Sequence, residues 1–233
     1  MVTYHVVSLF PESLDSYVNS SILKRAQERG LVSIKYYNPR DFVKSSKYDE
    51  KAIEKMTYAE RRVDNRPYGG GPGMVIEAMP VINSIEAAVG KKIKNAGAKS
   101  VKIIFFSPAG KKFTNVMAES FKKYTDIVLV CGRYEGIDAR VRKAFSMTDI
   151  SIGDYVLTGG ELPAMVMIDT ITRRIPGVLG DETSIEELRV SSPDVYTRPE
   201  VIEYKKKKLR VPKVLLSGHH AQMDEWKKGK RVK

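Results

Sequence analysis

Residues 132–160 read GRYEGIDARVRKAFSMTDISIGDYVLTGG, and this stretch decides the fold. It holds two glycine-spaced loops, 132–138 and 151–160, on either side of one short helical pattern. The first loop directly follows the apolar run 127–131, which is typical of a buried strand. Glycines at such a position let the backbone come close to a bound molecule. Two loops of this kind, brought side by side, predict a pocket lined by main-chain amides and therefore a small-molecule cofactor.

The rest of the first 180 residues alternates between strand-like and helical patterns. Strands are expected at 4–9, 32–37, 101–106 and 127–131, with a further one near 150–152, because these runs are rich in Val, Ile and aromatic residues. Helices are expected at 12–29, 77–89, 114–122, 138–145 and 161–175, the first two ending at Gly30 and Gly90. This alternation predicts an α/β domain with a mostly parallel sheet.

Two stretches interrupt the alternation. Residues 44–63 are charged and weakly periodic, which indicates a surface helix or a mobile insertion. They lead into 66–74, where four glycines and two prolines rule out regular structure. This loop lacks both the P-loop ending and the dinucleotide-site spacing, so its pattern alone favours a structural role. Residues 177–199 have little apolar periodicity, and we place a domain boundary near residue 180.

The charge of the chain is concentrated near its end. The net charge is +12 over 233 residues, and residues 198–233 hold 12 Lys and Arg against 4 Asp and Glu. This is either a solvated basic tail or a surface that binds phosphates, since clustered cations gain affinity for a polyanion by releasing counterions.

The few cysteines and histidines argue against disulfide bonds and against a metal site. The single cysteine, Cys131, cannot form an internal disulfide, so a reducing cytoplasm is expected. His219 and His220 are adjacent and cannot share one face of a helix or strand, so no metal site is expected. No apolar run approaches the length that crosses a bilayer, and the N-terminus lacks the basic region of a signal peptide.

Several short motifs occur together and in a fixed order. They are SLFPE (8–12), PRDF (39–42), PYGGGPGM (67–74), SPxG (107–110), VCGRYEGID (130–138), SIGDYVL (151–157), GGELPA (159–164), IPGVLG (175–180), YTRPE (196–200) and VLLSG (214–218). Each motif alone is weak, but the whole set resembles the bacterial tRNA (guanine-N1)-methyltransferases of the SPOUT class. Those enzymes modify the guanosine just 3′ of the anticodon.

The resemblance implies a fold and a domain plan. The expected fold is a SPOUT-type α/β domain whose parallel sheet carries a deep C-terminal trefoil knot, followed by a small, mostly helical domain. The knotted cofactor-binding domain would span 1–180, a linker 181–199, and a short basic tRNA-binding domain 200–233. The family continues further after Trp226, so this last domain would be shortened, or the chain would be a piece of a longer protein.

The resemblance also implies the cofactor and its site. S-adenosylmethionine would be held in a bent shape by three knot loops. Glu135 would balance its ammonium and sulfonium charges, alone or together with Mg²⁺. The implied cofactor-binding residues are Phe106, Ser107, Pro108, Gly132, Tyr134, Glu135, Gly136, Ser151, Ile152, Gly153, Asp154, Tyr155, Val156, Leu157, Gly159, Gly160 and Pro163. Family members are homodimers with active sites built from both chains, so the apolar face of 161–175 would be partly an interface.

The expected reaction needs two catalytic groups. Guanine N1 carries a proton, and removing it places negative charge on O6, so the site requires a base near N1 and a cation near O6. The spacing of Asp169 and Arg173 indicates only a helical ion pair, but the resemblance makes Arg173 the cation at O6. The family's base is an aspartate in the linker. Glu187 takes its place here, with Glu186 as the alternative.

The sequence leaves two other functions open. One is a methyltransferase of the same fold that acts on another RNA position, although the segments 67–74 and 196–200 argue against it. The other is an RNA-binding protein that keeps the cofactor pocket but lacks catalysis, for which the substituted base is the only support. In every case the partner would be RNA, contacted by the Lys205–Lys208 run, Arg210, Lys213 and the basic residues of 227–233.

Overall fold

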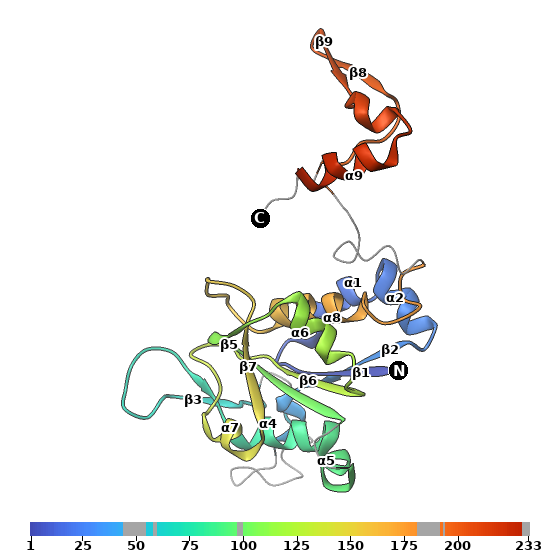
Figure 1. The fold of residues 1–233 in the computed structure, drawn as a ribbon. Helices are drawn as coiled ribbons and strands as arrows, with labels where there is room; N and C mark the ends of the chain where they lie inside the picture. The colour runs from blue at the N-terminus through green and yellow to red at the C-terminus, as the bar shows by residue number, and fades with distance from the viewer. Residues whose placement is uncertain (44–54, 58–59, 97–99, 181–191, 193, 230–233) are drawn as a thin grey trace. The chain divides into compact units, whose positions relative to one another are not determined.

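The computed structural model describes residues 1–43, 55–57, 60–96, 100–180, 192 and 194–229 (Figure 1). These residues divide into two compact units, Met1–Leu179 and Gly180–Lys233. Most of the charged stretch 44–63 lies outside the described residues, so the helix or insertion expected there stays a prediction. No helix in the described part of the chain has the length and apolar character needed to cross a membrane.

The first unit is built on a five-stranded parallel sheet with the strand order β2-β1-β6-β5-β7. This confirms the predicted α/β class. Every predicted strand is present, although the bounds differ by a few residues. The strands are β1 (Val2–Val7), β2 (Val32–Tyr37), β5 (Val101–Lys112), β6 (Asp126–Val130) and β7 (Met147–Ser151).

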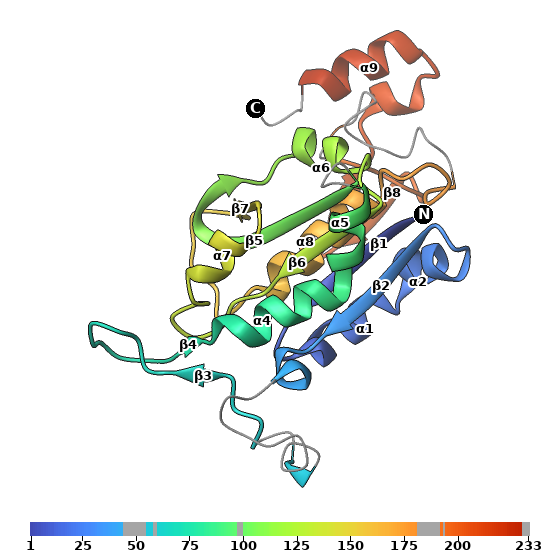
Figure 2. The ribbon, with the colours of Figure 1, turned by 90° about the horizontal axis from the view of Figure 1, so that it is seen from below.

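Helices cover both faces of this sheet (Figures 1 and 2). On β6, Ile127 and Leu129 point into one core while Val128 and Val130 point into the other. Because both faces are buried, the central strands are apolar throughout rather than alternating. One face carries α1 (Asp15–Val18), α2 (Ser21–Glu28), α6 (Asn115–Phe121) and α8 (Glu161–Thr172); the other carries α4 (Ala78–Ile85), α5 (Lys91–Ala96) and α7 (Arg140–Ala144).

Two of the expected helices differ from the prediction. The segment 12–29 is not one helix but a 3₁₀ turn (Pro11–Leu14) followed by α1 and α2, because Ser20 adopts an extended conformation between them. The expected stop at Gly90 is wrong, since the helix passes through a π-helical turn (Glu86–Gly90) directly into α5. Gly90 does not adopt the left-handed conformation that ends a helix.

Strand β5 is longer than expected and is interrupted where the pocket forms. Its pairing with β7 shifts register between Phe106 and Lys111, so the chain leaves the sheet and returns to it. At the return, a Cβ on Gly110 would lie 2.6 Å from the backbone nitrogen of Ile150. Only glycine permits such a close crossing of two backbones.

The second unit contains a hairpin that the sequence did not predict. Strands β8 (Val201–Tyr204) and β9 (Lys207–Arg210) pair antiparallel, followed by a 3₁₀ turn (Lys213–Leu216) and α9 (His220–Gly229). Lys205 and Lys206 form the tight turn in the left-handed conformation, with φ of 48° and 63°. Two-residue hairpin turns usually contain Asn or Gly. A run of lysines therefore does not predict a hairpin turn.

Candidate cofactor pocket and active site

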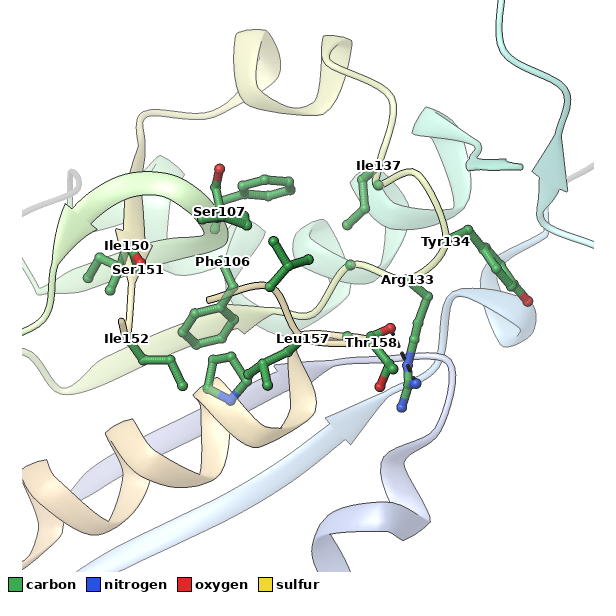
Figure 3. Close-up of a pocket in the computed structure, with 18 of the residues that line it drawn as sticks. Phe106, Ser107, Arg133, Tyr134, Ile137, Ile150, Ser151, Ile152, Leu157 and Thr158 are labelled. Atoms are coloured by element: carbon green, nitrogen blue, oxygen red, sulfur yellow. Dashed lines mark hydrogen bonds between the residues drawn. The ribbon is translucent and has the colours of Figure 1, made fainter. Parts of the chain in front are cut away.

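A cavity of about 410 Å³ lies at the carboxyl ends of β6 and β7, where β5 is interrupted (Figure 3). Three chain segments line it: the interruption of β5, the loop after β6 with the helix that follows, and the loop from β7 into α8. This edge of a parallel sheet is where open α/β proteins place their ligands. The two glycine-spaced loops that the sequence singled out therefore come together around one cavity.

Most of the residues expected at the cofactor line this cavity. They are Phe106, Ser107, Pro108, Gly132, Tyr134, Glu135, Gly136, Ser151, Ile152, Tyr155, Val156, Leu157, Gly159, Gly160 and Pro163. Gly153 and Asp154 do not line it, because the ring of Tyr155 lies over Gly153 and the Asp154 carboxylate pairs with Lys112.

The cavity has further lining residues that sequence reasoning missed. They are Phe105, Arg133, Ile137, Arg142, Ile150 and Thr158. Arg133 and Thr158 belong to the two loops already singled out, but their types suggested no contact with a ligand. Arg142 in α7 pairs with Asp149 and lies over the ring of Phe105, and no local sequence pattern signals either contact.

The loop after β6 is held in an uncommon backbone conformation. Tyr134 has φ of 58° and Gly136 has φ of 121°, both in the left-handed region. A non-glycine residue there is costly and tends to occur at functional sites. The loop is fixed from outside, since the Ile76 amide donates to the Gly136 carbonyl at 2.9 Å. A contact from outside the loop therefore helps to hold this conformation.

The two glycine loops contact one another directly. The Gly160 amide donates to the Gly132 carbonyl at 3.0 Å, and Arg133 forms an isolated antiparallel bridge with Gly159. A Cβ on Gly160 would lie 2.6 Å from the Cα of Cys131. Glycine is required at position 160 because two backbones meet there.

The cavity combines apolar walls with a few charges. In Figure 3, Phe106, Ile152 and Leu157 gather at one side of the cavity, while Arg133 and Tyr134 extend at the other. Glu135 is exposed at the rim. Walls of this kind suit the flat face of a ring, and a carboxylate at the rim suits a positively charged ligand group.

The glycine-rich loop 66–74 lies beside the cavity. Its ends form the short hairpin β3 (Asp64–Asn65) and β4 (Val75–Ile76), which projects from the first unit (Figure 2). The Glu135 amide donates to the Met74 carbonyl at 3.0 Å, and a Cβ on Gly73 would lie 2.5 Å from Oε1 of Glu135. The sequence pattern favoured a purely structural role for this loop, but the loop contacts Glu135, a residue that lines the pocket.

Of the two expected catalytic residues, Arg173 and Glu187, the structure describes only Arg173. Arg173 is half-buried at the carboxyl end of α8, whose first residue, Glu161, lies beside the pocket. At about 1.5 Å per residue, the helix carries Arg173 about 18 Å from that end. Glu187 and Glu186 lie outside the described residues. Within one chain, the structure does not bring Arg173 to the pocket.

The fold and the site together define the class: an α/β protein with a cavity lined by glycine-spaced loops at the carboxyl edge of its parallel sheet. The chain belongs to the tRNA (guanine-1)-methyltransferase family, because the family model described as "tRNA (Guanine-1)-methyltransferase TrmD" matches residues 2–233.

Individual relatives agree with this assignment. A tRNA (guanine-N(1)-)-methyltransferase of Clostridioides difficile is 40% identical over 99% of this chain and 92% of its own length. One from Carboxydothermus hydrogenoformans is 43% identical over 96% of this chain and 80% of its own. The crystal structure of an Aquifex aeolicus tRNA (m1G37) methyltransferase superposes with a TM-score of 0.71 at 34% identity, covering 97% of this chain and 87% of that one.

Proposed function

We propose that this chain transfers a methyl group from S-adenosylmethionine, bound in the cavity between the glycine loops, to N1 of the guanosine 3′-adjacent to the anticodon of tRNA. The reaction follows from the family: the chain is a tRNA (guanine-N1)-methyltransferase, an enzyme class that uses S-adenosylmethionine as methyl donor. The main support for the proposed site is that loops 132–138 and 151–160 line the same cavity.

The residues of the cavity fit this donor. A volume of about 410 Å³ lies within the range of about 300–1,000 Å³ that is usual for small-molecule sites. The apolar side with Phe106, Ile152 and Leu157 would take the adenine ring, and the Glu135 carboxylate would face the positive charges. When bound, S-adenosylmethionine supplies an electrophilic methyl group that needs no activation by the protein.

The protein must instead prepare the guanine. We assign Arg173 to O6, where a guanidinium stabilises the negative charge that develops as N1 loses its proton. We assign Glu187 as the base at N1, with Glu186 as the alternative; a glutamate can accept this proton with one methylene more reach than an aspartate. Both glutamates lie outside the described residues, in the stretch 181–199 that the sequence marks as a linker.

The position of Arg173 supports a homodimer with shared active sites. An arginine about 18 Å along α8 from the pocket of its own chain can serve a pocket only if a second copy presents it. The rim of the pocket and the nearby face of α8 also expose large apolar side chains: Tyr155, Val156, Leu162 and Val166 are 56%, 81%, 53% and 43% exposed. Exposed apolar clusters of this kind mark interfaces.

The same proposal includes the trefoil knot and the tRNA-binding unit. The close crossings at Gly110 and Gly160 support a chain that threads through itself around the pocket. The exposed lysines of the β8–β9 hairpin support contacts between the second unit and tRNA phosphates. We place the enzyme in the cytoplasm, where its substrate is made.

No step is assigned to Mg²⁺. Among the residues that the structure describes, no group of three or more His, Cys, Asp or Glu side chains could hold a metal ion. A requirement for Mg²⁺ is a separate part of the proposal, and the methyl-transfer assay with and without a chelator measures it.

The experiment is methyl transfer from labelled S-adenosylmethionine to unmodified tRNA transcripts. We expect incorporation only when a guanosine follows the anticodon, and an adenosine at that position serves as the control. Incorporation at another nucleotide would support a methyltransferase of different site specificity. Binding of tRNA without incorporation would support the non-catalytic alternative, and either result would contradict the proposal.

A further inference from the structure

An ion pair in the wall of the pocket, between a partly buried arginine and a buried glutamate, has no part in the proposed chemistry. Nε of Arg133 lies 3.0 Å from Oε2 of Glu161, and the Glu161 side chain is only 4% exposed. The two atoms face each other without the alignment of a hydrogen bond, and both are sealed from solvent. The pair connects the loop after β6 with the first turn of α8.

The pair is part of a larger contact set. Ser8 donates its hydroxyl to Oε1 of Glu161 at 2.6 Å, and the Arg133 guanidinium lies 4.9 Å from the centre of the Phe10 ring. Nη1 of Arg133 also reaches the Thr158 carbonyl at 3.5 Å, which Figure 3 shows as a contact between the two pocket loops. We call Ser8, Arg133 and Glu161 the latch. It joins three segments that are far apart in the sequence.

The latch acts on the backbone that lines the pocket. A Cβ on Gly159 would lie 2.5 Å from both Nε of Arg133 and Oε2 of Glu161, so the ion pair lies directly against the Gly159 backbone. Gly159, Gly160 and Arg133 itself line the cavity. A shift of Arg133 or Glu161 would therefore move the wall of the pocket itself.

Stability alone does not explain a buried pair of this kind. Removing two charges from water costs free energy that an ion pair recovers only with well-aligned hydrogen bonds, and here the central contact lacks that alignment. Apolar side chains of similar volume would serve a purely structural role at least as well. Fixing the geometry of a binding site is a use for which such pairs are suited.

We infer that the latch positions the two glycine loops at the spacing that S-adenosylmethionine requires. Ser8, Arg133 and Glu161 are positioning residues: they act through the backbones of Gly159 and Gly160 and are not assigned to the reacting atoms. This inference rests on the proposed function, because it names what holds the proposed donor site in shape.

The test compares Glu161→Gln with the wild type in steady-state kinetics, calorimetric binding and thermal unfolding. Glutamine keeps the shape and the hydrogen bond from Ser8 but removes the charge. We expect the KM and Kd for S-adenosylmethionine to rise about tenfold, because a small misplacement of a site is costly. The KM for tRNA and the kcat at saturating donor should stay within about threefold of the wild type.

Three further variants test whether an effect on donor binding comes from the latch. Ser8→Ala removes one hydroxyl and should raise the KM for the donor in the same direction by a smaller factor. Arg133→Lys keeps the charge but not the planar guanidinium, and should bind the donor more tightly than Arg133→Gln. Glu119→Gln, in an exposed ion pair of α6, is the matched control and should change nothing.

Two outcomes would overturn the inference. One is an unchanged donor KM in Glu161→Gln. The other is a parallel loss of donor affinity, tRNA affinity and melting temperature, which indicates general loosening. If the wild type itself binds no S-adenosylmethionine, the proposed function fails instead, so the two failures are distinguishable.

Discussion

His5 sits inside the sheet with both ring nitrogens engaged. Nε2 lies 2.9 Å from Oδ1 of Asp126, and Nδ1 lies 3.2 Å from the Tyr37 hydroxyl. Lys92 approaches both oxygens of Asp126, at 2.6 and 2.7 Å. Burial lowers the pKa of His5 and outweighs the hydrogen bond to Asp126, which acts to raise it. The neutral ring satisfies this arrangement, since it donates to Asp126 and accepts from Tyr37.

These surroundings predict how stability depends on pH. A histidine with a lowered pKa takes up its proton more readily in the unfolded chain, so its contribution is complete above about pH 6.5 and declines as the pH falls below that value. Burial acts to raise the pKa of Asp126, but hydrogen bonds from Lys92, His5 and Thr125 outweigh it and hold that pKa below its usual value. The contribution of Asp126 is therefore lost only in stronger acid.

Urea unfolding at pH 7.5 and 5.5 measures the His5 effect. We expect the wild type to lose more stability across this interval than His5→Gln, which cannot titrate at that position. All other groups are the same in the two proteins and cancel in the comparison. Equal losses would show that folding leaves the pKa of His5 unchanged, which would contradict the burial argument.

The assignment of the base is tested by two neighbouring substitutions. Glu187→Gln should lower kcat by about 10²-fold or more, in line with the loss of a positioned general base. Glu186→Gln, its matched control, should have a much smaller effect. Small and equal effects in single-turnover methyl transfer would place the base elsewhere.

The roles of individual residues in the site are harder to predict from the sequence than the position of the pocket. The pattern around Arg173 and Asp169 indicated an ordinary helical ion pair, and only the family resemblance gave Arg173 a role. The contact of Arg133 with Glu161 joins the loop after β6 to the first turn of α8, and no local pattern signals it. Glycine-spaced loops at strand ends, by contrast, do predict a pocket, because backbone approach depends on the glycines themselves.

At the scale of elements, the pocket depends on backbones that cross without side chains between them. Gly160→Ala places a Cβ 2.6 Å from the Cα of Cys131, and backbone atoms cannot move aside as a side chain can. We expect a loss of about 1–3 kcal/mol in the free energy of unfolding, typical of overpacking. Donor affinity should fall as well.

Gly180→Ala is the control for this prediction, because a Cβ there has no atom within 4 Å. Its free energy of unfolding should stay within about 0.5 kcal/mol of the wild type. If chemical denaturation gave the two variants equal stability, the close crossing of the loops would not exist in solution.

The sequence predicts the strands of the parallel sheet better than the helices and the second hairpin. Parallel strands were recognised because both of their faces are buried, which makes them continuous apolar runs. The break of the first helix at Ser20 and the continuation through Gly90 were missed, since packing overrides single-residue signals. The β8–β9 hairpin was missed because Lys205 and Lys206 form its turn without glycine.

At the scale of the whole molecule, the account requires two copies of the chain. Arg173→Ala alone should abolish turnover and leave donor affinity nearly intact, because the arginine acts on charge that develops in the transition state. Gly132→Phe should fill the pocket, since the atoms nearest to a Cβ at Gly132, in Ile137 and Gly136, lie 3.7 Å or more away. Each variant alone should be inactive.

Mixing the two variants tests the shared site. A mixed dimer has one intact pocket that faces one intact Arg173, so random pairing should restore about a quarter of the wild-type activity. The subunits are exchanged by co-expression, and methyl transfer is compared with each variant alone. If the mixture stays inactive while mixed dimers are present, each site lies within one chain.

Calorimetric titration of S-adenosylmethionine into the purified protein measures whether the glycine loops bind the methyl donor, with Gly132→Phe as the folded control. We expect saturable binding at one site per chain for the wild type and none for Gly132→Phe. Absence of binding to folded wild-type protein, or equal binding to both proteins, would contradict the claim that the two glycine loops hold the methyl donor.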